Sequence, residues 1–183
     1  ATADEAGVAI VAGDTKVLER GKGDGLFVNT AGVGFLPDDV RMGAGEIRPG
    51  DKILVNGTLG DHGIAVMSRR EGLDIGVELE SDVAPLTDLI ARVRDVAPNV
   101  RFMRDVTRGG LAAVGNEIVL DRPWGLRIFD VAVPIHDVVE DVSEMLGIDP
   151  LLAANEGKVL MVVPPDEADA ALERYLRDRA TVR

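Results

Sequence analysis

The residues of this chain best suited to chemistry first appear at positions 13–16, where an apolar run is interrupted. An acid, a hydroxyl and an amine follow one another at Asp14, Thr15 and Lys16, and the apolar pattern resumes at Val17. Gly-Asp is a common turn pair, because glycine accepts a positive φ and aspartate bonds its own backbone. The stretch is therefore either a turn between two strands or the polar edge of a site.

A second polar stretch, Gly-Asp-His-Gly at 60–63, lies between an expected strand and an expected helix. The N–H groups at a helix N-terminus are free to bind an anion. Alternatively, Asp61 is a simple N-cap, since aspartate is favoured at that position. A single histidine such as His62 is more often a surface or packing residue than a catalyst, so both interpretations stay open here.

A third stretch, "RDVTRGGLA" at 104–112, places Gly109 and Gly110 in the first turn of an expected helix. Two glycines there cost about 1 kcal/mol each relative to alanine. A sequence tolerates that cost where a ligand or another backbone segment must come close. Asp105 and Thr107 are alternatively caps of the helix.

The fourth stretch groups Asn155, Glu156 and Lys158 around Gly157. A helix C-cap at Gly157 would explain the glycine, because helices often end in a left-handed residue. It would not explain three polar side chains in a row of four residues, which favours a functional site.

Several familiar sites are absent from the sequence. It contains neither G-x-x-x-x-G-K-[ST] nor a G-x-G-x-x-G that opens a helix after a strand. If phosphate is bound, carboxylates that hold Mg²⁺ must contribute, and Asp14 and Asp105 are the candidates. The lack of cysteine excludes thiolate ligands and cysteine nucleophiles within the chain, and two histidines argue against a histidine-rich metal site.

Charge and composition narrow the class of protein. The 183 residues carry a net charge of −12, from 20 basic and 32 acidic side chains. Such a field repels nucleic acid and anionic membranes and predicts a soluble cytoplasmic protein. No apolar run approaches the roughly 18 residues that a membrane span needs. Because the chain begins with "ATADEAGVAIV", typical of a helix end entering a strand, we expect it to begin inside a domain.

The elements that must position these stretches follow from apolar periodicity and turn residues. Strands are expected at 7–13, 15–19, 25–36, 52–56, 125–135 and 158–164. Helices are expected at 58–73 (ended by Gly72), 85–97, 107–120, 136–147 (closed by Gly147) and 166–178 (with Asp166 as N-cap).

These elements predict an α/β (α+β) fold in two parts. A β-rich run gives way near Pro49 to strands that alternate with helices. Alternating elements of this kind indicate a layered sheet covered by helices. We therefore expect a partial β-rich domain at 1–48 and an α/β domain at 49–183.

Five segments resemble one family, in the same order along the chain. They are "IVAGDTKVLERGKGDGLFVNTAGVG", "RPGDKILVNGTLGDHGIAVMSRREGL", "ESDVAPL", "RDVTRGGLAAVGNEI" and "DPLLAANEGKVLMVV". The chain is thereby identified as similar to the hydrogenase maturation factor HypE family, in the PurM-like ATP-binding superfamily with aminoimidazole ribonucleotide (AIR) synthetase. The resemblance implies that 1–48 is the C-terminal part of the PurM-like N-terminal domain. It also implies that 49–183 is the PurM-like C-terminal domain, truncated at its end.

The resemblance implies an enzyme that uses ATP to dehydrate a carbamoylated C-terminal cysteine to a thiocyanate. The cyanide then becomes an iron ligand of [NiFe] hydrogenase. ATP and Mg²⁺ are the implied cofactors. A homodimer formed through the first domain, the carbamoyltransferase HypF and the HypC–HypD complex are the implied partners. The carrier cysteine of the family lies in a C-terminal tail that this sequence does not include, so we expect the chain alone to be inactive.

Site residues are carried over from the family by position. Lys16 and Glu156 are the implied catalytic residues, and Asp14 and Asp105 the implied metal ligands. The implied ATP and phosphate contacts are Asp14, Thr15, Gly60, Asp61, His62, Gly63, Asp105, Thr107, Arg108, Gly109, Gly110 and Asn155.

Two other functions remain open from the sequence. The first is another PurM-like synthetase or kinase that phosphorylates a small molecule. The second is a non-catalytic assembly module that docks hydrogenase maturation partners.

Overall fold

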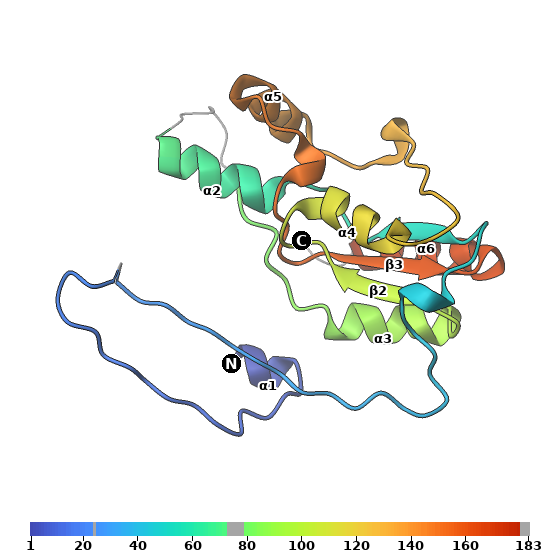
Figure 1. Ribbon diagram of the computed structural model, residues 1–183, viewed down its shortest axis with the longest axis horizontal. Helices are drawn as coiled ribbons and strands as arrows, with labels where there is room; N and C mark the ends of the chain where they lie inside the picture. Colours follow the sequence, from blue (N-terminus) through green and yellow to red (C-terminus); the bar gives the residue numbers. More distant parts are fainter. Residues whose placement is uncertain (24, 73–78, 180–183) are drawn as a thin grey trace. The chain divides into compact units, whose positions relative to one another are not determined.

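The computed structural model describes residues 1–23, 25–72 and 79–179. It divides into two compact units, Ala1–Val40 and Arg41–Arg183 (Figure 1), which are described separately. The final residues of the predicted second domain, 180–183, lie outside the described part of the chain.

The first unit holds one short helix, α1 (Thr2–Glu5), and no strand among its described residues. The strands predicted at 7–13, 15–19 and 25–36 are therefore wrong in this structure. A strand is stabilised by a hydrogen-bonded neighbour and a buried face. Here the apolar side chains have neither: Val11 is 92% exposed, Val33 95% and Phe35 98%.

The second unit is built on a three-stranded antiparallel sheet in the order β1-β3-β2. The strands are β1 (Lys52–Val55), β2 (Phe102–Asp105) and β3 (Val159–Val163). The strands predicted at 52–56 and 158–164 are confirmed, whereas β2 was not predicted. Met161 in the central strand lies opposite Leu54 on one side and Met103 on the other.

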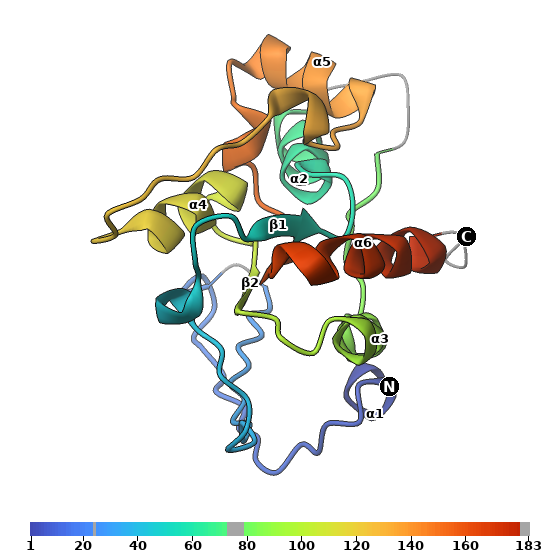
Figure 2. The same cartoon turned by 90° about the vertical axis from the view of Figure 1, so that its right-hand side faces the viewer.

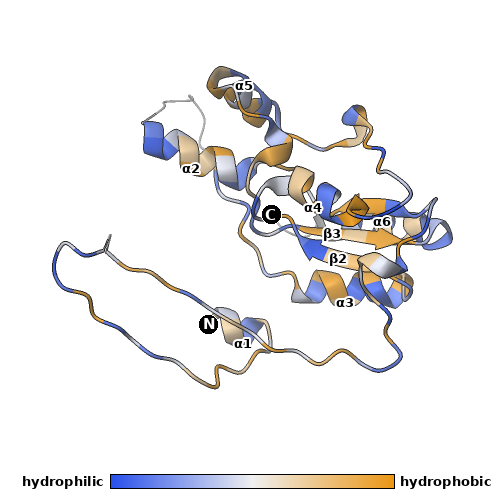
Figure 3. Cartoon of the chain, viewed as in Figure 1, coloured by the Kyte–Doolittle hydropathy of each residue, from blue (hydrophilic) through white to orange (hydrophobic). Residues whose placement is uncertain are grey.

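The central strand β3 is buried along its whole length, so its alternate side chains serve both faces of the sheet. Val159, Met161 and Val163 join a core with α3 (Thr87–Val96) and α6 (Pro165–Arg179). Leu160 and Val162 join a second core with α4 (Gly110–Val119). The sheet is thus covered by helices on both faces, as the alternating pattern predicts, and Figure 3 shows the apolar colouring of β3 between them.

Two further helices form a smaller core of their own. Helices α2 (Asp61–Glu71) and α5 (Asp137–Leu146) pack around Ile64, Val139 and Val142 (Figure 2). Both end in a left-handed glycine, Gly72 and Gly147, whose N–H groups satisfy carbonyls of the last turn. The five helices predicted in this unit, and these two stops, are confirmed.

Two local predictions in this unit are wrong. Residues 125–135 form no strand; the segment contains only a 3₁₀ turn at Asp130–Ala132. Asp130 and Pro134 interrupt the apolar run, and proline cannot donate to a sheet ladder. Helix α6 begins at Pro165, so Asp166 lies inside its first turn and is not its N-cap. Two other 3₁₀ turns occur at Ala44–Glu46 and Pro150–Leu152.

No helix within the described residues combines the length and apolar character required to cross a membrane.

Candidate functional site

The turn at 60–63 touches the segment that precedes β3. Gly60 caps α2 in a left-handed conformation with φ of 90°, and a Cβ at this position would lie 2.8 Å from Val139 Cγ1. The Gly63 N–H donates to the carbonyl of Ala154 at 2.9 Å, where a Cβ would again be too close. Gly63 is therefore required by the close approach of the Ala154 backbone, and Gly60 by its left-handed φ and the Val139 side chain beside it.

Asp61 is the first residue of α2, not its N-cap, so the alternative of a simple cap is wrong. Its buried carboxylate accepts a hydrogen bond from the Thr58 hydroxyl at 2.5 Å. The other oxygen lies 2.9 Å from Nδ1 of His136. Both carboxylate oxygens are thus engaged within the protein.

Asn155 links three of the four polar stretches. It is fully buried, and its Oδ1 accepts from the Gly60 N–H at 2.8 Å. Its Nδ2 donates to the carbonyls of Val106 and Ala153, each at 3.0 Å. One amide therefore holds the start of α2, the end of β2 and the segment before β3 together, and all of its observed bonds go to backbone.

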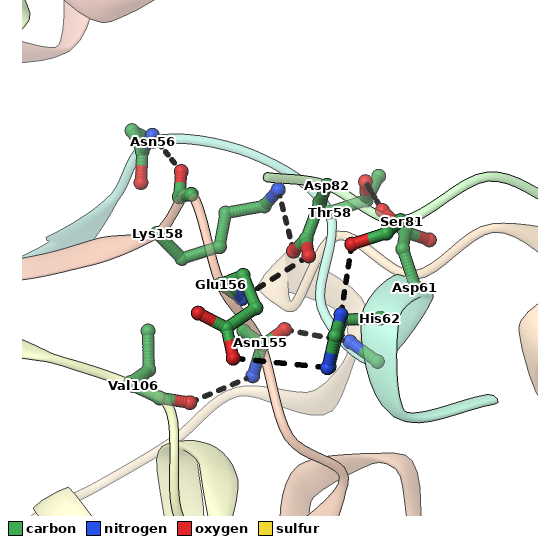
Figure 4. Close-up of polar contacts among 12 residues, drawn as sticks. Asn56, Thr58, Asp61, His62, Ser81, Asp82, Val106, Asn155, Glu156 and Lys158 are labelled. Atoms are coloured by element: carbon green, nitrogen blue, oxygen red, sulfur yellow. Dashed lines mark hydrogen bonds and ion pairs between the residues drawn. The ribbon is translucent and has the colours of Figure 1, made fainter. Parts of the chain in front are cut away.

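Glu156, next in the chain, faces solvent and His62. Its Oε1 lies 3.7 Å from Nε2 of His62, and the two side chains are 40% and 24% exposed (Figure 4). The other ring nitrogen of His62, Nδ1, lies 2.8 Å from Oγ of Ser81. A carboxylate and an imidazole that face each other at a partly exposed surface can exchange protons.

A buried ion pair fixes the backbone on either side of Gly157. Lys158 Nζ lies 2.8 Å from Oδ2 of Asp82, and these side chains are only 9% and 5% exposed. The Glu156 N–H donates to Asp82 Oδ1 at 3.1 Å, and the Gly157 N–H to the Asp82 carbonyl at 3.0 Å. Residues 82–84 run so close that a Cβ on Gly157 would overlap the Asp82 carbonyl and the Ala84 N–H.

This contact decides between the two explanations of Gly157. No helix ends at this glycine, because the preceding element is the 3₁₀ turn at Pro150–Leu152. The glycine is needed for backbone approach. The loop that makes the approach, including Ser81 and Asp82, was not among the predicted site residues, although it lies in "ESDVAPL", one of the segments that resemble the HypE family.

The third polar stretch, residues 104–112, surrounds the N-terminus of α4. A pocket of about 190 Å³ is lined by Arg104, Asp105, Thr107, Arg108, Val114 and Glu117. The N-cap is Gly109 with φ of 68°, and no side chain caps the helix, so Asp105 and Thr107 are not caps. A Cβ on Gly110 would lie 2.6 Å from the Ala153 carbonyl, so this glycine also permits close packing.

In this pocket the positive charge of Arg104 is balanced by two exposed carboxylates, those of Glu117 and Asp105. Arg104 lies 3.2 Å from Glu117 through Nε and 3.3 Å from Asp105 through Nη1. The hydrogen bond with Glu117, and then the charges of Glu117 and Asp105, raise the pKa of the Arg104 guanidinium. Arg108 is exposed beside the free N–H groups at the start of α4. A basic side chain and free N–H groups suit a phosphate, and Asp105 offers one carboxylate to a cation.

Asp14, Thr15 and Lys16 lie in the first unit, where all three are exposed. The Thr15 N–H donates to Asp14 Oδ1 at 2.8 Å, the local bond that the turn interpretation predicts. Within the described residues, no three His, Asp or Glu side chains gather closely enough to hold a metal ion. Any cation bound through Asp14 or Asp105 would therefore need further oxygen ligands, which water or nucleotide phosphates can supply to Mg²⁺.

The structure thus brings together residues 60–63, 105–110 and 155–156 of the predicted site. It adds Ser81, Asp82 and Lys158 to this group. The polar side-chain atoms of Asp61 and Asn155 make contacts within the protein.

Comparisons with known proteins show the family and the fold of this chain. The family described as "AIR synthase related protein, C-terminal domain" matches residues 48–181. The carbamoyl dehydratase HypE of Bradyrhizobium diazoefficiens is 50% identical over 173 residues, which are 94% of this chain and 50% of that protein. The chain therefore spans about half the length of the curated relatives it matches.

Solved structures extend the likeness. The crystal structure of E. coli HypE superposes with a TM-score of 0.90 at 46% identity, covering 95% of this chain and 54% of that one. A HypE structure in complex with ATP gives a TM-score of 0.80 at 36% identity, covering 95% and 52%. A HypE–HypF complex gives 0.81 at 41% identity, covering 95% and 57%. The predicted PurM-like fold and the resemblance to HypE are confirmed.

Proposed function

This chain belongs to the AIR synthase related protein, C-terminal domain family, and on that premise we propose that it forms part of an ATP-dependent carbamoyl dehydratase. The reaction would convert a carbamoylated cysteine to a thiocyanate and supply cyanide to the iron of [NiFe] hydrogenase. The observation that carries the proposal is the 50% identity to a carbamoyl dehydratase over 94% of the chain. The chain has no cysteine of its own, so the carbamoyl group must be presented by another segment.

We propose that nucleotide phosphates bind at the start of α4. The pocket lined by Asp105, Thr107 and Arg108 supports this, because it combines a guanidinium, a hydroxyl and free helix N–H groups. Gly109, the left-handed N-cap, and Gly110, the first residue of α4, form the turn that leads into the helix at this point. The reported complex of a HypE relative with ATP supports the choice of nucleotide.

Asp105 would hold Mg²⁺ together with phosphate oxygens, and when bound the ion supplies charge neutralisation for phosphoryl transfer. Asp14, in the first unit, is the other candidate ligand. The residues of the second unit fit this role in part, since Asp105 is exposed at the edge of the pocket. Thr15, in the first unit, is a further candidate phosphate contact, whereas in the turn at 60–63 the Asp61 carboxylate and the N–H groups of Gly60 and Gly63 are engaged within the protein.

Two side chains would act on the carbamoyl group. Lys16 would stabilise the negative charge that develops on the reacting oxygen. Glu156 would remove protons from the nitrogen. The partly exposed carboxylate of Glu156, on a backbone anchored by Asp82, supports this assignment.

We further propose the partners and place of action. A homodimer, HypF and the HypC–HypD complex would be the partners, and the HypE–HypF complex of a relative supports the choice of HypF. The net charge of −12 favours action in the cytoplasm. Residues 1–48 would be part of a PurM-like N-terminal domain, and 49–183 would be the C-terminal domain.

Nucleotide binding tests this proposal. The chain would be joined to the segments of the E. coli relative that lie outside the match, and Mg-ATP affinity measured by calorimetry. Arg108→Ala and Asp14→Ala should each weaken binding by roughly 10-fold, the scale of one charged contact. Arg127→Ala, at a basic residue outside this pocket, should bind ATP normally. If Arg108→Ala and Asp14→Ala bound Mg-ATP as tightly as Arg127→Ala and the unsubstituted protein, the proposed nucleotide site would be refuted.

A further inference from the structure

His62 has no contact that explains why an imidazole, rather than another polar group, stands beside Glu156. Its Nε2 lies 3.7 Å from Glu156 Oε1, and its Nδ1 lies 2.8 Å from Ser81 Oγ. Neither Ser81 nor Glu156 is fully buried, so packing alone does not require a histidine. We propose that His62 accepts a proton from Glu156 during the reaction, which resets Glu156 to take a second one. This inference rests on the proposed function.

The chemistry of a carbamoyl dehydration demands two proton acceptors. The carbamoyl oxygen bonds to the γ-phosphorus of ATP as the bond from that phosphorus to ADP breaks. The C–O bond then breaks, and phosphate leaves with the oxygen and its electron pair. The nitrogen loses both of its protons, and the electron pairs of the two N–H bonds supply the two additional C–N bonds of the thiocyanate. A single carboxylate holds one proton at a time, so the first must move on before the second can be taken.

The geometry suits His62 to this task. When Nδ1–H donates to the Ser81 oxygen, Nε2 carries the free lone pair and faces Glu156. The distance of 3.7 Å is bridged by a small rotation of either side chain, and catalytic hydrogen bonds are often long before substrate binds. Because His62 is 24% exposed, it can return the proton to solvent. His62 acts through Glu156 and is in this sense a positioning residue.

Among the described residues, Lys158, Asp82 and Asp61 are titratable groups on the neighbouring segments, and all three are engaged elsewhere. Lys158 and Asp82 form their buried pair behind Glu156. Asp61, on the same helix as His62, accepts from Thr58 and lies against His136. Of the charged groups on the three segments in contact here, His62 is the one that faces the Glu156 carboxylate (Figure 4). The departing phosphate is the competing acceptor for the second proton.

The experiment uses the chain joined to the segments of the E. coli relative outside the match, with its cysteine carbamoylated. His62→Gln keeps a polar amide but cannot take a proton, so thiocyanate formation should slow by roughly 10- to 100-fold, within the range of acid–base catalysis. The KM for ATP should change by less than about twofold, because the step affected follows binding. Added imidazole should restore turnover to His62→Ala, since the position is reached by solvent.

The control is Glu144→Gln, at an exposed acid on α5, which should turn over within about twofold of the unsubstituted protein. Wild-type turnover in His62→Gln would overturn the inference and assign the second proton to the phosphate. A slow His62→Ala variant that imidazole does not rescue would also overturn it, by indicating a structural role. Absence of thiocyanate from the unsubstituted protein would instead overturn the proposed function, and this inference with it.

Discussion

Replacing Asn155 with alanine tests the internal support of the site on the chain as it stands. The variant removes an acceptor from the Gly60 N–H and a donor from the carbonyls of Val106 and Ala153. Three hydrogen bonds at about 1 kcal/mol each give about 3 kcal/mol, and stranding the buried Gly60 N–H adds about 1 kcal/mol or more. We expect the free energy of unfolding to fall by about 4 kcal/mol, a large part of the stability of a typical domain.

Urea denaturation followed by circular dichroism measures this loss. With an m-value of about 2 kcal/mol/M for a domain of this size, the midpoint should fall by about 2 M. Asn116→Ala is the matched control, because the exposed Asn116 side chain donates to the Ala112 carbonyl of its own helix and joins no other segment that the structure describes. That variant should change the free energy by less than about 0.5 kcal/mol. If Asn155→Ala were equally mild, the three stretches would not be held together by this amide.

Two further predictions concern the second unit. Lys158→Met should lower the free energy of unfolding, measured by urea denaturation, by about 3–5 kcal/mol, because it leaves the Asp82 carboxylate buried and unpaired. Adding Asp82→Asn to that variant should recover part of the loss, and no recovery would contradict the pairing. Burial raises the pKa of Tyr175, so its neutral form is favoured in the folded state, and this contribution to stability is present below the usual tyrosine pKa of about 10 and lost as pH rises above it. Tyr175→Phe should therefore flatten the alkaline loss of stability measured between about pH 9 and 11, and an unchanged profile would contradict the argument.

The elements that the sequence predicts best are those whose apolar side chains repeat on a single face or fill a buried run. Strand β3 is continuous Val, Leu and Met, and it occupies the centre of the sheet. Helices α2 and α5 carry an apolar stripe and end at glycines that take a left-handed conformation. In these segments local pattern and tertiary packing favour the same structure, so periodicity is sufficient.

Other elements depend on partners that periodicity cannot identify. Strand β2 has two half-buried and two exposed residues, and only its pairing with β3 makes it a strand. Residues 125–135 have the opposite property, an apolar run typical of a strand without a ladder to join. The same holds for 7–36, where apolar pattern without a hydrogen-bonded neighbour gives no sheet.

The candidate site shows the same division. Of the glycines at 60, 63, 109, 110 and 157, the structure explains Gly63, Gly110 and Gly157 by the close approach of another backbone segment, and Gly60 and Gly109 by a left-handed φ. Asp82 lies in the family-like segment "ESDVAPL", but its role could not be predicted, because its hydrogen bond to the Glu156 N–H spans 74 positions. Long-range contacts of this kind leave no local spacing to detect.

The most direct measurement of the central claim is the mass of the carbamoylated cysteine in a protein that carries this chain. The chain would be joined to the remaining segments of the E. coli relative, carbamoylated, and incubated with and without Mg-ATP. We predict that the cysteine loses one water only when ATP is present. Glu156→Gln and Lys16→Ala should each slow that loss by roughly 100-fold, the scale of one acid–base or electrostatic group. Glu140→Ala, at an exposed residue of α5, should not slow it. Dehydration at the unsubstituted rate in both the Glu156 and Lys16 variants, or none in the unsubstituted protein, would contradict the account.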